Sequence, residues 1–334
     1  MVLHRVVTYN VRRFSHGKDK LDTVDLIIQR LRPLLPISLL ALNEVDVALR
    51  PHALGRLSDA LGLEHSEFFG HVASGNYGNA LLSAAPLLRR ETHHLDGGTV
   101  VKSSGAFSPK GQEHRIVRGL LTAYTHIGGV PVGVGVTHLD HMQEAERVIQ
   151  ARHVLRAMLP APRSEESDDG ASQLLLLGDL NALSRADYSP AQWAQHEQHN
   201  AQRGWGSPSD SGARDGCVGI LRTAGFEDCV RLALMRGSAT AADASGAGDG
   251  ATGGVQRDGM WSAPPWSAHV HARDGPRYRI DYVLSRPPPR GSQARLACVS
   301  ARVANVTDDG GQSSDHCPVA VDFEVVQAQS SSSA

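Results

Sequence analysis

The apolar positions of this chain form short strand-like runs and longer helix-like runs that alternate along its first part. Residues 2–11 ("VLHRVVTYNV") and 37–46 ("ISLLALNEVD") are short β-branched or continuously apolar runs, which are typical of strands. Residues 19–33 and 50–62 instead repeat their apolar side chains at helical spacing, and each run ends at a Pro or Gly. The pattern predicts the order strand, helix, strand, helix.

The rest of the chain predicts further strands and another helix. Residues 130–141 ("VPVGVGVTHLDH") alternate strictly from Val130 to Val136, which is the period of a pleated strand. Residues 144–159 predict a helix whose apolar face carries Ala145, Val148, Ile149, Leu155, Met158 and Leu159. Other apolar runs predict strands at residues 78–87, 118–127, 174–182, 278–285 and 317–325.

Polar, low-complexity segments interrupt this order. Residues 160–173 and 236–259 have little to bury against the entropy of ordering, so we expect mobile insertions there. Residues 327–334 are expected to form a disordered tail. Because no linker separates two self-sufficient cores, residues 1–326 are predicted to be one domain.

Charge and cysteine content narrow the classes of function. The 334 residues include 33 Lys and Arg against 35 Asp and Glu, which lacks the basic excess of a protein that tracks long nucleic acid by charge alone. The four cysteines have no CxxC spacing and are too sparse for a disulfide framework. With no secretory or transmembrane segment, we expect an intracellular protein, cytoplasmic or nuclear, and the sequence indicates no protein partner.

The informative regularity is a set of polar residues at the strand ends. Asp315 and His316 introduce the last predicted strand, although burying such groups unpaired is costly. Comparable residues end or enter the other strands: Asn10, Glu44, His138, Asp179, Asn181 and Asp281. Each alone is an ordinary turn or surface residue. As a set they lie where a sheet gathers ligands and catalytic groups.

These residue types favour phosphate chemistry with a hard metal ion. Oxygen-rich ligation suits Mg²⁺ or Mn²⁺, and the set includes the carboxylates of Glu44, Asp179, Asp281 and Asp315. A metal polarises a phosphoryl group, a carboxylate orients the attacking water, and a histidine donates to phosphoryl oxygens. A zinc site would need another set, such as His138, His141 and a carboxylate, and is a minor alternative.

The motifs also occur in a recognisable order. The series "TYNV", "NEVD", "GNALLS", "VTHLDH", "GDLNA", "RIDYVL" and "SSDHCPV" resembles the endonuclease/exonuclease/phosphatase superfamily of Mg-dependent phosphoesterases, which includes apurinic endonucleases, DNase I-like nucleases and deadenylases. "GNYGNALLS" and "THLDH" are most similar to its broad, mostly uncharacterised branch. The resemblance implies an α/β fold: a four-layered α/β sandwich with two mixed β-sheets packed face to face, helices outside and the site at one end.

The resemblance implies roles for the oxygen-bearing residues of the set. Glu44 would be the main Mg²⁺ ligand, and Asp315 would lie at the metal or hold its water. Asp179 would orient or activate the attacking water. Asn10 would assist phosphate or water positioning, and Asn181 would hydrogen-bond the phosphate.

Two histidines complete the implied site. His138 would contact a phosphoryl oxygen, and Asp281 would brace His316, which contacts the scissile phosphate. The chain departs from the apurinic endonuclease branch at Arg12, where an acidic residue or Asn is common, and at Asn43, where Gln is usual. The first departure weakens a DNA-repair interpretation, whereas the second keeps an amide side chain.

Aromatic and basic residues near the implied site have two interpretations. They either stack on a base or clamp a phosphate, or they only cover the edge of the sandwich, and the second interpretation is favoured after the "GDLNA" loop. The residues concerned there are Tyr188, Trp193, Arg203 and Trp205. Arg115 and Arg118 are similarly either phosphate contacts or strand-edge residues.

The features together predict a Mg²⁺-dependent phosphoesterase, most directly a phosphodiesterase that uses metal-assisted attack by water. Its phosphate-ester substrate is open among nucleic acid, nucleotide, phospholipid head group and inositol phosphate. One alternative is a DNA or RNA nuclease of the repair or deadenylase type. Another is a non-catalytic binding or scaffold member of the same fold, which usually comes with eroded catalytic positions, whereas the positions of this chain are intact.

Overall fold

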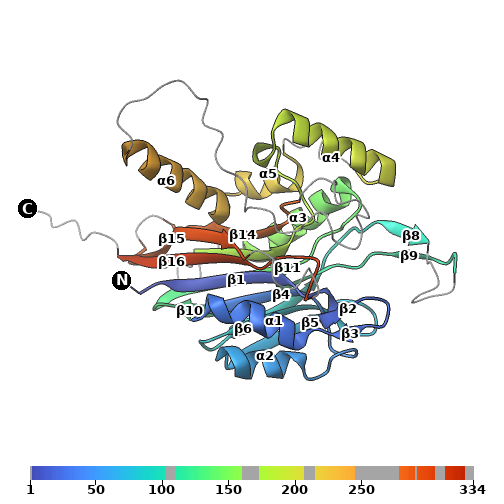
Figure 1. Cartoon of the computed structure of the whole chain (residues 1–334), viewed down its shortest axis with the longest axis horizontal. Coiled ribbons are helices and arrows are strands. Elements are labelled where there is room, and N and C mark those ends of the chain that lie inside the picture. The colour runs from blue at the N-terminus through green and yellow to red at the C-terminus, as the bar shows by residue number, and fades with distance from the viewer. Residues whose placement is uncertain are drawn as a thin grey trace, which may run out of the picture.

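Two mixed β-sheets lie face to face at the centre of the protein, with helices outside them (Figure 1). The computed structural model describes the chain over residues 2–102, 110–159, 173–206, 215–244, 278–289, 292–304 and 313–327, with the backbone alone for 238–244. Within the described residues, no helix is long and apolar enough to span a membrane.

The first sheet has six strands in the order β15-β16-β1-β4-β6-β5. β1 and β4 run parallel, and all other neighbours in this sheet are antiparallel. Its strands are β1 (His4–Asn10), β4 (Leu39–Asp46), β5 (His65–Gly70), β6 (Tyr77–Ser83), β15 (Ala294–Val303) and β16 (Val319–Gln327). The central position of β1 places the end of that strand deep in the molecule.

The second sheet also has six strands, in the order β13-β14-β12-β11-β10-β7. Here β11 and β12 are the parallel pair. The strands are β7 (Leu88–His94), β10 (Gly119–Ile127), β11 (Val130–Thr137), β12 (Gln173–Asp179), β13 (Glu227–Asp228) and β14 (Asp281–Arg286). Two small hairpins, β2 (Ser15–His16) with β3 (Leu21–Asp22) and β8 (Val100–Lys102) with β9 (Glu113–Arg115), stand apart from the sheets.

Helices cover the outer faces of both sheets (Figure 1). The first sheet is covered by α1 (Val24–Leu31) and α2 (Ala53–Leu61), and the second by α3 (Glu144–Met158) and α5 (Gly216–Thr223). The remaining helices are α4 (Pro190–Arg203), α6 (Cys229–Ala244) and the short 3₁₀ turns η1 (Arg12–Phe14), η2 (Arg32–Leu34) and η4 (Arg185–Asp187).

Alternating side chains on the strands build the layers. On β1, Val6 lies in the core between the two sheets, whereas Val7 lies in the core under α1 and α2. On β12, Leu175 likewise faces the other sheet and Leu176 faces α3 and α5. Strands buried on both faces read as continuous apolar runs. The predicted four-layered α/β sandwich is confirmed.

The apolar face expected for the helix at 144–159 is confirmed at Val148 but wrong at Ala145 and Ile149. Ile149 is 42% exposed, and Ala145 is exposed as well. Glu144 is buried instead, because its Oε2 accepts a 2.6 Å hydrogen bond from Arg147 Nε and its Oε1 accepts one from the backbone of Cys217. The start of α3 therefore buries a paired polar face, which hydrophobic spacing does not reveal.

Some elements carry too little apolar pattern to be predicted. β7 ("LRRETHH") is almost wholly exposed at a sheet edge, and β5 and β15 were missed as well. Leu21 belongs to the exposed hairpin strand β3 rather than to the first helix. α6 extends through residues 236–244, the first part of a segment expected to be loop. Residues 160–172, 245–259 and 328–334 lie outside the described residues.

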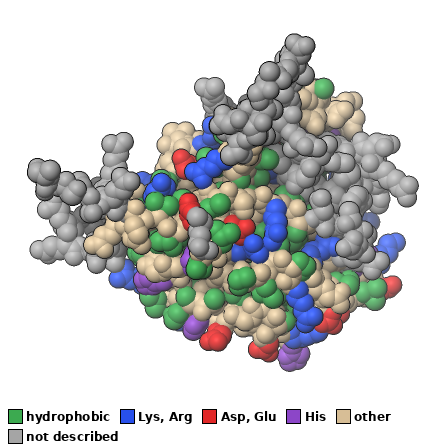
Figure 2. All heavy atoms as spheres, turned by 60° about the vertical axis from the view of Figure 1, so that its left-hand side comes forward, with side chains coloured by type: hydrophobic (Ala, Val, Ile, Leu, Met, Phe, Trp, Pro, Cys, Tyr) green, Lys and Arg blue, Asp and Glu red, His purple; other side chains and the backbone are tan. Residues whose placement is uncertain are grey.

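One face of the molecule is visible in Figure 2, turned from the view of Figure 1. Acidic, basic and hydrophobic side chains are interspersed on its coloured surface. This mixture agrees with the near-neutral charge balance of the whole chain, 33 basic against 35 acidic residues. A broad basic track of the kind that binds long nucleic acid is not visible on this described surface.

Candidate active site

The ends of the central strands of both sheets meet at one place. In the first sheet, Asn10 at the end of β1 pairs in register with Asn43 on β4. In the second sheet, Asp179 at the end of β12 pairs with Asp281 at the start of β14. The two sheets face each other, so these four positions bring polar side chains from both sheets to one end of the sandwich.

Asn10 links the two sheets through its side chain. Its Nδ2 donates to Glu44 Oε1 and to Asp179 Oδ2, each at 3.0 Å, and its Oδ1 accepts from the backbone N–H of Arg12 at 3.0 Å. The side chain is fully buried. One amide thus holds two predicted site carboxylates from different sheets next to each other.

The backbone at the site is unusual for its residue types. Glu44 lies in a bulge of the β4–β6 pairing and has φ 57°, and Asn181 has φ 49°. Non-glycine residues with positive φ are uncommon and gather at functional sites. Gly178 has φ 138°, and a Cβ there would lie 1.9 Å from the carbonyl oxygen of Thr137. Only glycine fits immediately before Asp179.

Asn43 connects the two sheets by hydrogen bonds beneath the site. Its Oδ1 accepts from the backbone N–H of Asp179 at 2.9 Å, and its Nδ2 donates to Asn79 Oδ1 at 2.9 Å and to the carbonyl of Thr137 at 3.1 Å. All of these groups are buried. The amide that precedes Glu44 therefore fixes the distance between β4 and β12, which accounts for the need for an amide at this position.

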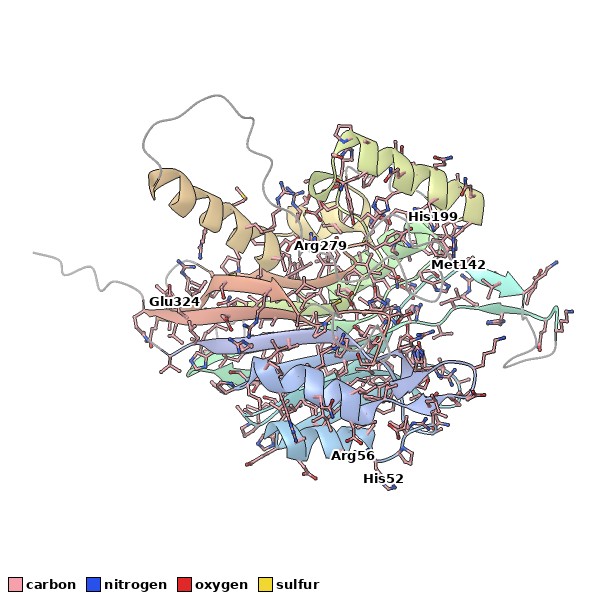
Figure 3. All side chains as sticks on the ribbon, viewed as in Figure 1. His52, Arg56, Met142, His199, Arg279 and Glu324 are labelled. Atoms are coloured by element: carbon pink, nitrogen blue, oxygen red, sulfur yellow. The ribbon has the colours of Figure 1, made fainter. Side chains whose placement is uncertain are left out.

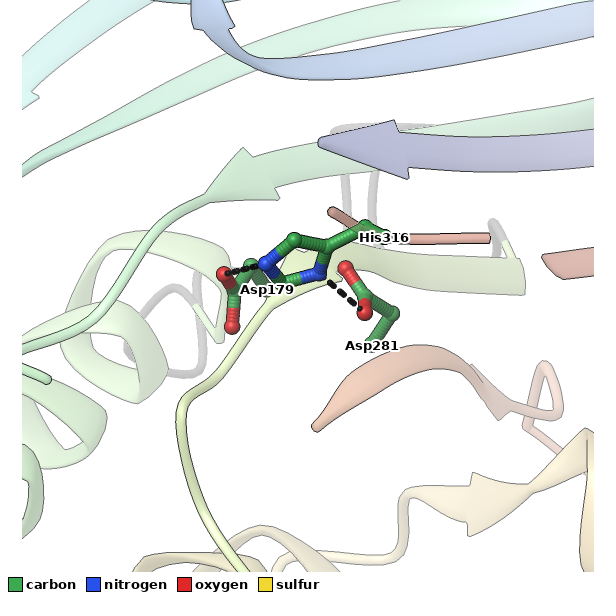
Figure 4. Close-up of side chains that lie close together, drawn as sticks. All are labelled: Asp179, Asp281 and His316. Atoms are coloured by element: carbon green, nitrogen blue, oxygen red, sulfur yellow. Dashed lines mark hydrogen bonds and ion pairs between the residues drawn. The ribbon is translucent and has the colours of Figure 1, made fainter. Parts of the chain in front are cut away.

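His316 lies between two aspartates (Figure 4). Its Nδ1 is 2.8 Å from Asp281 Oδ2, and its Nε2 is 3.7 Å from Asp179 Oδ2. Burial acts to lower the pKa of His316, but the charges of Asp281 and Asp179 outweigh it and raise that pKa well above its usual value. The raised pKa favours the imidazolium form, and the structure brings Asp281 and His316 together at hydrogen-bond distance.

His138 is oriented by Arg118. The guanidinium Nη1 of Arg118 lies 3.3 Å from His138 Nδ1, and its Nη2 lies 3.2 Å from His141 Nδ1. A guanidinium can only donate, so Nδ1 of His138 accepts and its Nε2 carries the proton. Burial and the Arg118 charge hold the pKa of His138 well below its usual range. His138 is thus a neutral donor whose Nε2 lies 3.5 Å from Asp179 Oδ2.

Asp179 carries the clearest sign of crowded negative charge. Burial, followed by the charge of Asp281, raises the pKa of Asp179 to about 7, against the opposing effects of His316 and the Asn10 hydrogen bond. A divalent cation beside these oxygens would relieve that crowding. Glu44, Asp179 and Asp315 all line the same cavity, so the oxygen donors present fit a hard cation such as Mg²⁺.

A group of three side chains, Asp179, Asp281 and His316, has its ligand atoms within 4.8 Å of one another, which is the spacing of a metal site. His316 Nδ1 is held by Asp281, however, so these two serve a cation poorly as ligands. The other carboxylates that line the cavity with Asp179 are Glu44 and Asp315, and these are the candidate oxygen ligands. His141, part of the minor zinc alternative, lies outside this group of three.

Arg12 reaches the site from the turn after β1. Its Nε lies 3.6 Å from Asp315 Oδ2, and the Asp315 side chain is 10% exposed. An arginine at this position places a cation where the apurinic branch has an acidic residue or Asn. The departure thus reduces the negative charge on the Asp315 side of the site.

The cavity has a volume of about 290 Å³ and extends past the predicted residues. The sequence missed Tyr77, Met142 and Tyr278 as lining residues and left Arg118 undecided. Burial and the neighbouring Glu44 raise the pKa of Tyr77 well above its usual value. Tyr77 stands at the start of β6 in "GNYGNALLS", and this strand-end position is the signal that could have found it.

The aromatic residues after the "GDLNA" loop divide into two groups. Tyr188 and Trp193 are buried in a small hydrophobic cluster, and Tyr188 Oη accepts from the backbone N–H of Arg279 at 2.9 Å. Trp205 instead lines the cavity, with the guanidinium of Arg203 5.1 Å from its ring centre. The covering interpretation holds for the first pair, and Trp205 belongs to the site.

Comparison with known proteins agrees with this geometry. The family model described as Endonuclease/Exonuclease/phosphatase family matches residues 7–316, so the chain belongs to that family. Its members are hydrolases of phosphoester bonds that generally depend on a divalent metal, and this chain is a hydrolase of that class. No curated protein matches the sequence.

Solved structures show the same fold at low identity. An endonuclease/exonuclease/phosphatase from Beutenbergia cavernae is 20% identical over 97% of this chain and 72% of its own, with a TM-score of 0.52. One from Bacteroides vulgatus is 16% identical over 98% of this chain and 100% of its own, with a TM-score of 0.59. D. rerio TDP2 complexed with a single-strand DNA product is 16% identical, covers 97% and 100%, and has a TM-score of 0.55.

Proposed function

We propose that this protein is a Mg²⁺- or Mn²⁺-dependent phosphodiesterase. The observation that supports this proposal most is the Asn10 amide. Its Nδ2 lies 3.0 Å from Glu44 Oε1 and 3.0 Å from Asp179 Oδ2, and both carboxylates line the cavity that His316 also lines. Glu44 and Asp315 hold the metal. When bound, the metal polarises the phosphoryl group and offsets its charge.

The side chains of the site divide the remaining work. Asp179 orients and deprotonates the attacking water, and the 3.0 Å hydrogen bond from Asn10 Nδ2 holds its carboxylate in place. His316, held as an imidazolium by Asp281, and neutral His138 donate to phosphoryl oxygens on which charge develops. Asn10 and Asn181 position the phosphate and the water.

A nuclease is the second candidate. The similarity in fold to D. rerio TDP2, solved with a single-strand DNA product, favours it. Arg12, which lies at Asp315, separates this chain from the apurinic branch and disfavours abasic-site repair. A non-catalytic scaffold is disfavoured because each predicted site position keeps its chemically competent residue.

One assay tests the proposal and separates the candidates. The purified chain with Mg²⁺ or Mn²⁺ is screened against abasic DNA, single-stranded RNA, poly(A), sphingomyelin, inositol phosphates and nucleotide diesters. We expect metal-dependent hydrolysis that His316→Ala lowers at least about a hundredfold, with the circular dichroism spectrum unchanged. Binding of metal without hydrolysis of any substrate would instead support the scaffold.

A further inference from the structure

The catalytic cavity has an apolar wall in addition to its charged end. This wall is formed by Met142, Leu183, Trp205, Tyr278 and Ile280. The same cavity of about 290 Å³ also holds Glu44, Asp179 and Asp315. That volume is at the small end for ligand pockets. A phosphate at the carboxylates and a group on the apolar wall must therefore be adjoining parts of one ligand.

The wall is held in place by backbone hydrogen bonds at the end of α4. Gly204 takes φ 67° and ends the helix, after which Trp205 N donates to Asn200 O at 2.8 Å. Gly206 N then donates to Met142 O at 2.8 Å, which ties this turn to the segment before α3. Figure 3 labels Met142 and His199 in this part of the molecule, with Glu324 at the opposite end. Hydrogen bonds within the protein thus hold the backbone at Trp205.

Ring contacts give the wall a flat aromatic surface. The His199 ring lies 6.3 Å from the Trp205 ring and 6.2 Å from the Tyr278 ring, so it connects the two aromatic side chains. An indole beside a phenol ring suits a ligand that carries a flat ring.

The charges at the cavity disfavour the other open substrates. Arg147 lines it but is paired with Glu144 at 2.6 Å, so it offers little to a polyphosphate such as an inositol phosphate. The described wall contributes no carboxylate, and Arg203 stands over one face of Trp205, so its positive charge opposes a quaternary ammonium head group. An uncharged flat ring is not repelled by that charge and can stack on Trp205 where the indole lines the cavity.

We propose that Trp205 and Tyr278 form a subsite for a nucleobase-like ring joined to the scissile phosphate. The part of this inference that concerns phosphate binding rests on the proposed function. Stacking of a base on an aromatic side chain is sequence-tolerant and contributes substantially to binding. The preferred substrate is therefore a nucleotide ester, either free or at the end of a single strand, rather than an alkyl ester of the same charge.

Binding tests the subsite without requiring turnover. Calorimetry in Mg²⁺ compares adenosine 5′-monophosphate with ribose 5-phosphate, which lacks only the base. We expect the nucleotide to bind at least about tenfold more tightly, and Trp205→Leu to remove most of that difference. A five-nucleotide single strand shows whether the ligand is a free nucleotide or the end of a strand. If the strand binds more tightly than adenosine 5′-monophosphate and its binding still depends on Trp205, the ligand is a strand end. If the two bind equally, the ligand is a free nucleotide.

The matched control is Phe68→Leu, an aromatic residue on β5 that packs against the core under α1 and α2 and does not line the cavity. Phe68→Tyr replaces it if the leucine variant fails to fold. Equal binding of the two phosphates by the unaltered protein would overturn the inference, as would an equal loss in the Phe68 and Trp205 variants.

Hydrolysis separates the inference from the proposed function. Thymidine 5′-(p-nitrophenyl) phosphate and methyl p-nitrophenyl phosphate share a leaving group, and their other ester group is a nucleoside in the first and a methyl group in the second. We expect Trp205→Leu to lower kcat/KM about tenfold or more for the first, mainly through KM, and less than about twofold for the second. If neither ester is hydrolysed while the base preference in binding persists, the proposed function fails and the subsite stands.

Discussion

Two aspartates that follow neighbouring parallel strands have opposite environments. Asp140 comes just after β11 and Asp179 ends β12, and both are at most 1% exposed. Burial alone would raise the pKa of Asp140, but hydrogen bonds from Thr99, Gln143 and Met142 lower it below its usual value. Burial and Asp281 raise the pKa of Asp179 to about 7. Asp140 is thus a carboxylate whose hydrogen bonds stabilise the fold, whereas Asp179 lies beside another negative charge, as a catalytic carboxylate often does.

The hydrogen bonds explain the difference. Asp140 Oδ1 accepts from Thr99 Oγ1 at 2.8 Å and from the backbone N–H groups of Met142 and Gln143, and its Oδ2 accepts from Thr99 N at 2.8 Å. These donors fix the loop that starts α3. Asp179 Oδ2 accepts from Asn10 Nδ2 at 3.0 Å and its Oδ1 accepts from the backbone N–H of Asn181 at 2.9 Å, while the Asp281 carboxylate lies nearby. Both side chains are closed to solvent, and the hydrogen-bond donors around Asp140 and the charge beside Asp179 account for their opposite pKa shifts.

The largest expected effect is on turnover. Asp179→Asn removes the proposed base and should lower kcat/KM by at least about a hundredfold on whichever phosphodiester the screen finds. Asp140→Asn keeps an acceptor for the loop and should lower it only a few-fold. Steady-state kinetics on both variants checks this, and similar losses in the two would mean that the aspartates do not differ in role.

The next effect is on stability. Asp140→Ala leaves the backbone N–H groups of Thr99, Met142 and Gln143 without their acceptor, which should cost about 2–4 kcal/mol of unfolding free energy. Urea denaturation monitored by circular dichroism measures it. Ser300→Ala, which removes one hydrogen bond to Asp322 far from the site, is a control with a loss of about 1 kcal/mol.

At Asp179 we expect a smaller change in the free energy of unfolding, with a sign opposite to that at Asp140. Its folded pKa of about 7 lies above the usual carboxyl value of 3.8, so the folded protein binds an extra proton between these values and loses stability as pH rises from about 4 to 7. In EDTA, Asp179→Asn should therefore be more stable than the unaltered protein at pH 8, by on the order of 1–2 kcal/mol.

The same measurement at pH 5 should show that gain shrinking, because protonated Asp179 no longer carries charge there. Asp140 has the reverse linkage: its lowered pKa stabilises the protein above about pH 4, its usual value being 3.8, and that contribution is lost as pH falls further. The deficit of Asp140→Asn should hence stay flat between pH 5 and 8. A flat profile for Asp179→Asn as well would contradict the crowding of its carboxylate.

The smallest effect is the stabilisation by metal. A ligand that binds only the folded state raises stability in proportion to the logarithm of its concentration over Kd. Millimolar Mg²⁺ or Mn²⁺ should raise the Tm of the unaltered protein and of Asp140→Asn by a few degrees, and that of Glu44→Gln much less. Differential scanning fluorimetry measures this, and an unchanged response in Glu44→Gln would remove Glu44 from the metal site.

The sequence placed the strands that carry the site but not all of its lining. The apolar runs ending at Asn10 and Asp179 are buried on both faces, which makes their pattern strong. Tyr278 and Arg118 reach the cavity from beside strands, where nothing in the local spacing distinguishes a lining residue from a surface one. The buried polar face of α3 was missed for a related reason, since its partners, such as Cys217, lie far along the chain.

The sequence by itself determined the alternation of strands and helices, the oxygen-rich residue set at the strand ends and, through the order of its motifs, the family. The tertiary structure decided which of these residues meet. Asn10 contacts Asp179, 169 positions away, because two sheets pack face to face and Asn43 and Gly178 fix how closely β4 and β12 approach. Such contacts depend on register and packing between elements, which no local period encodes.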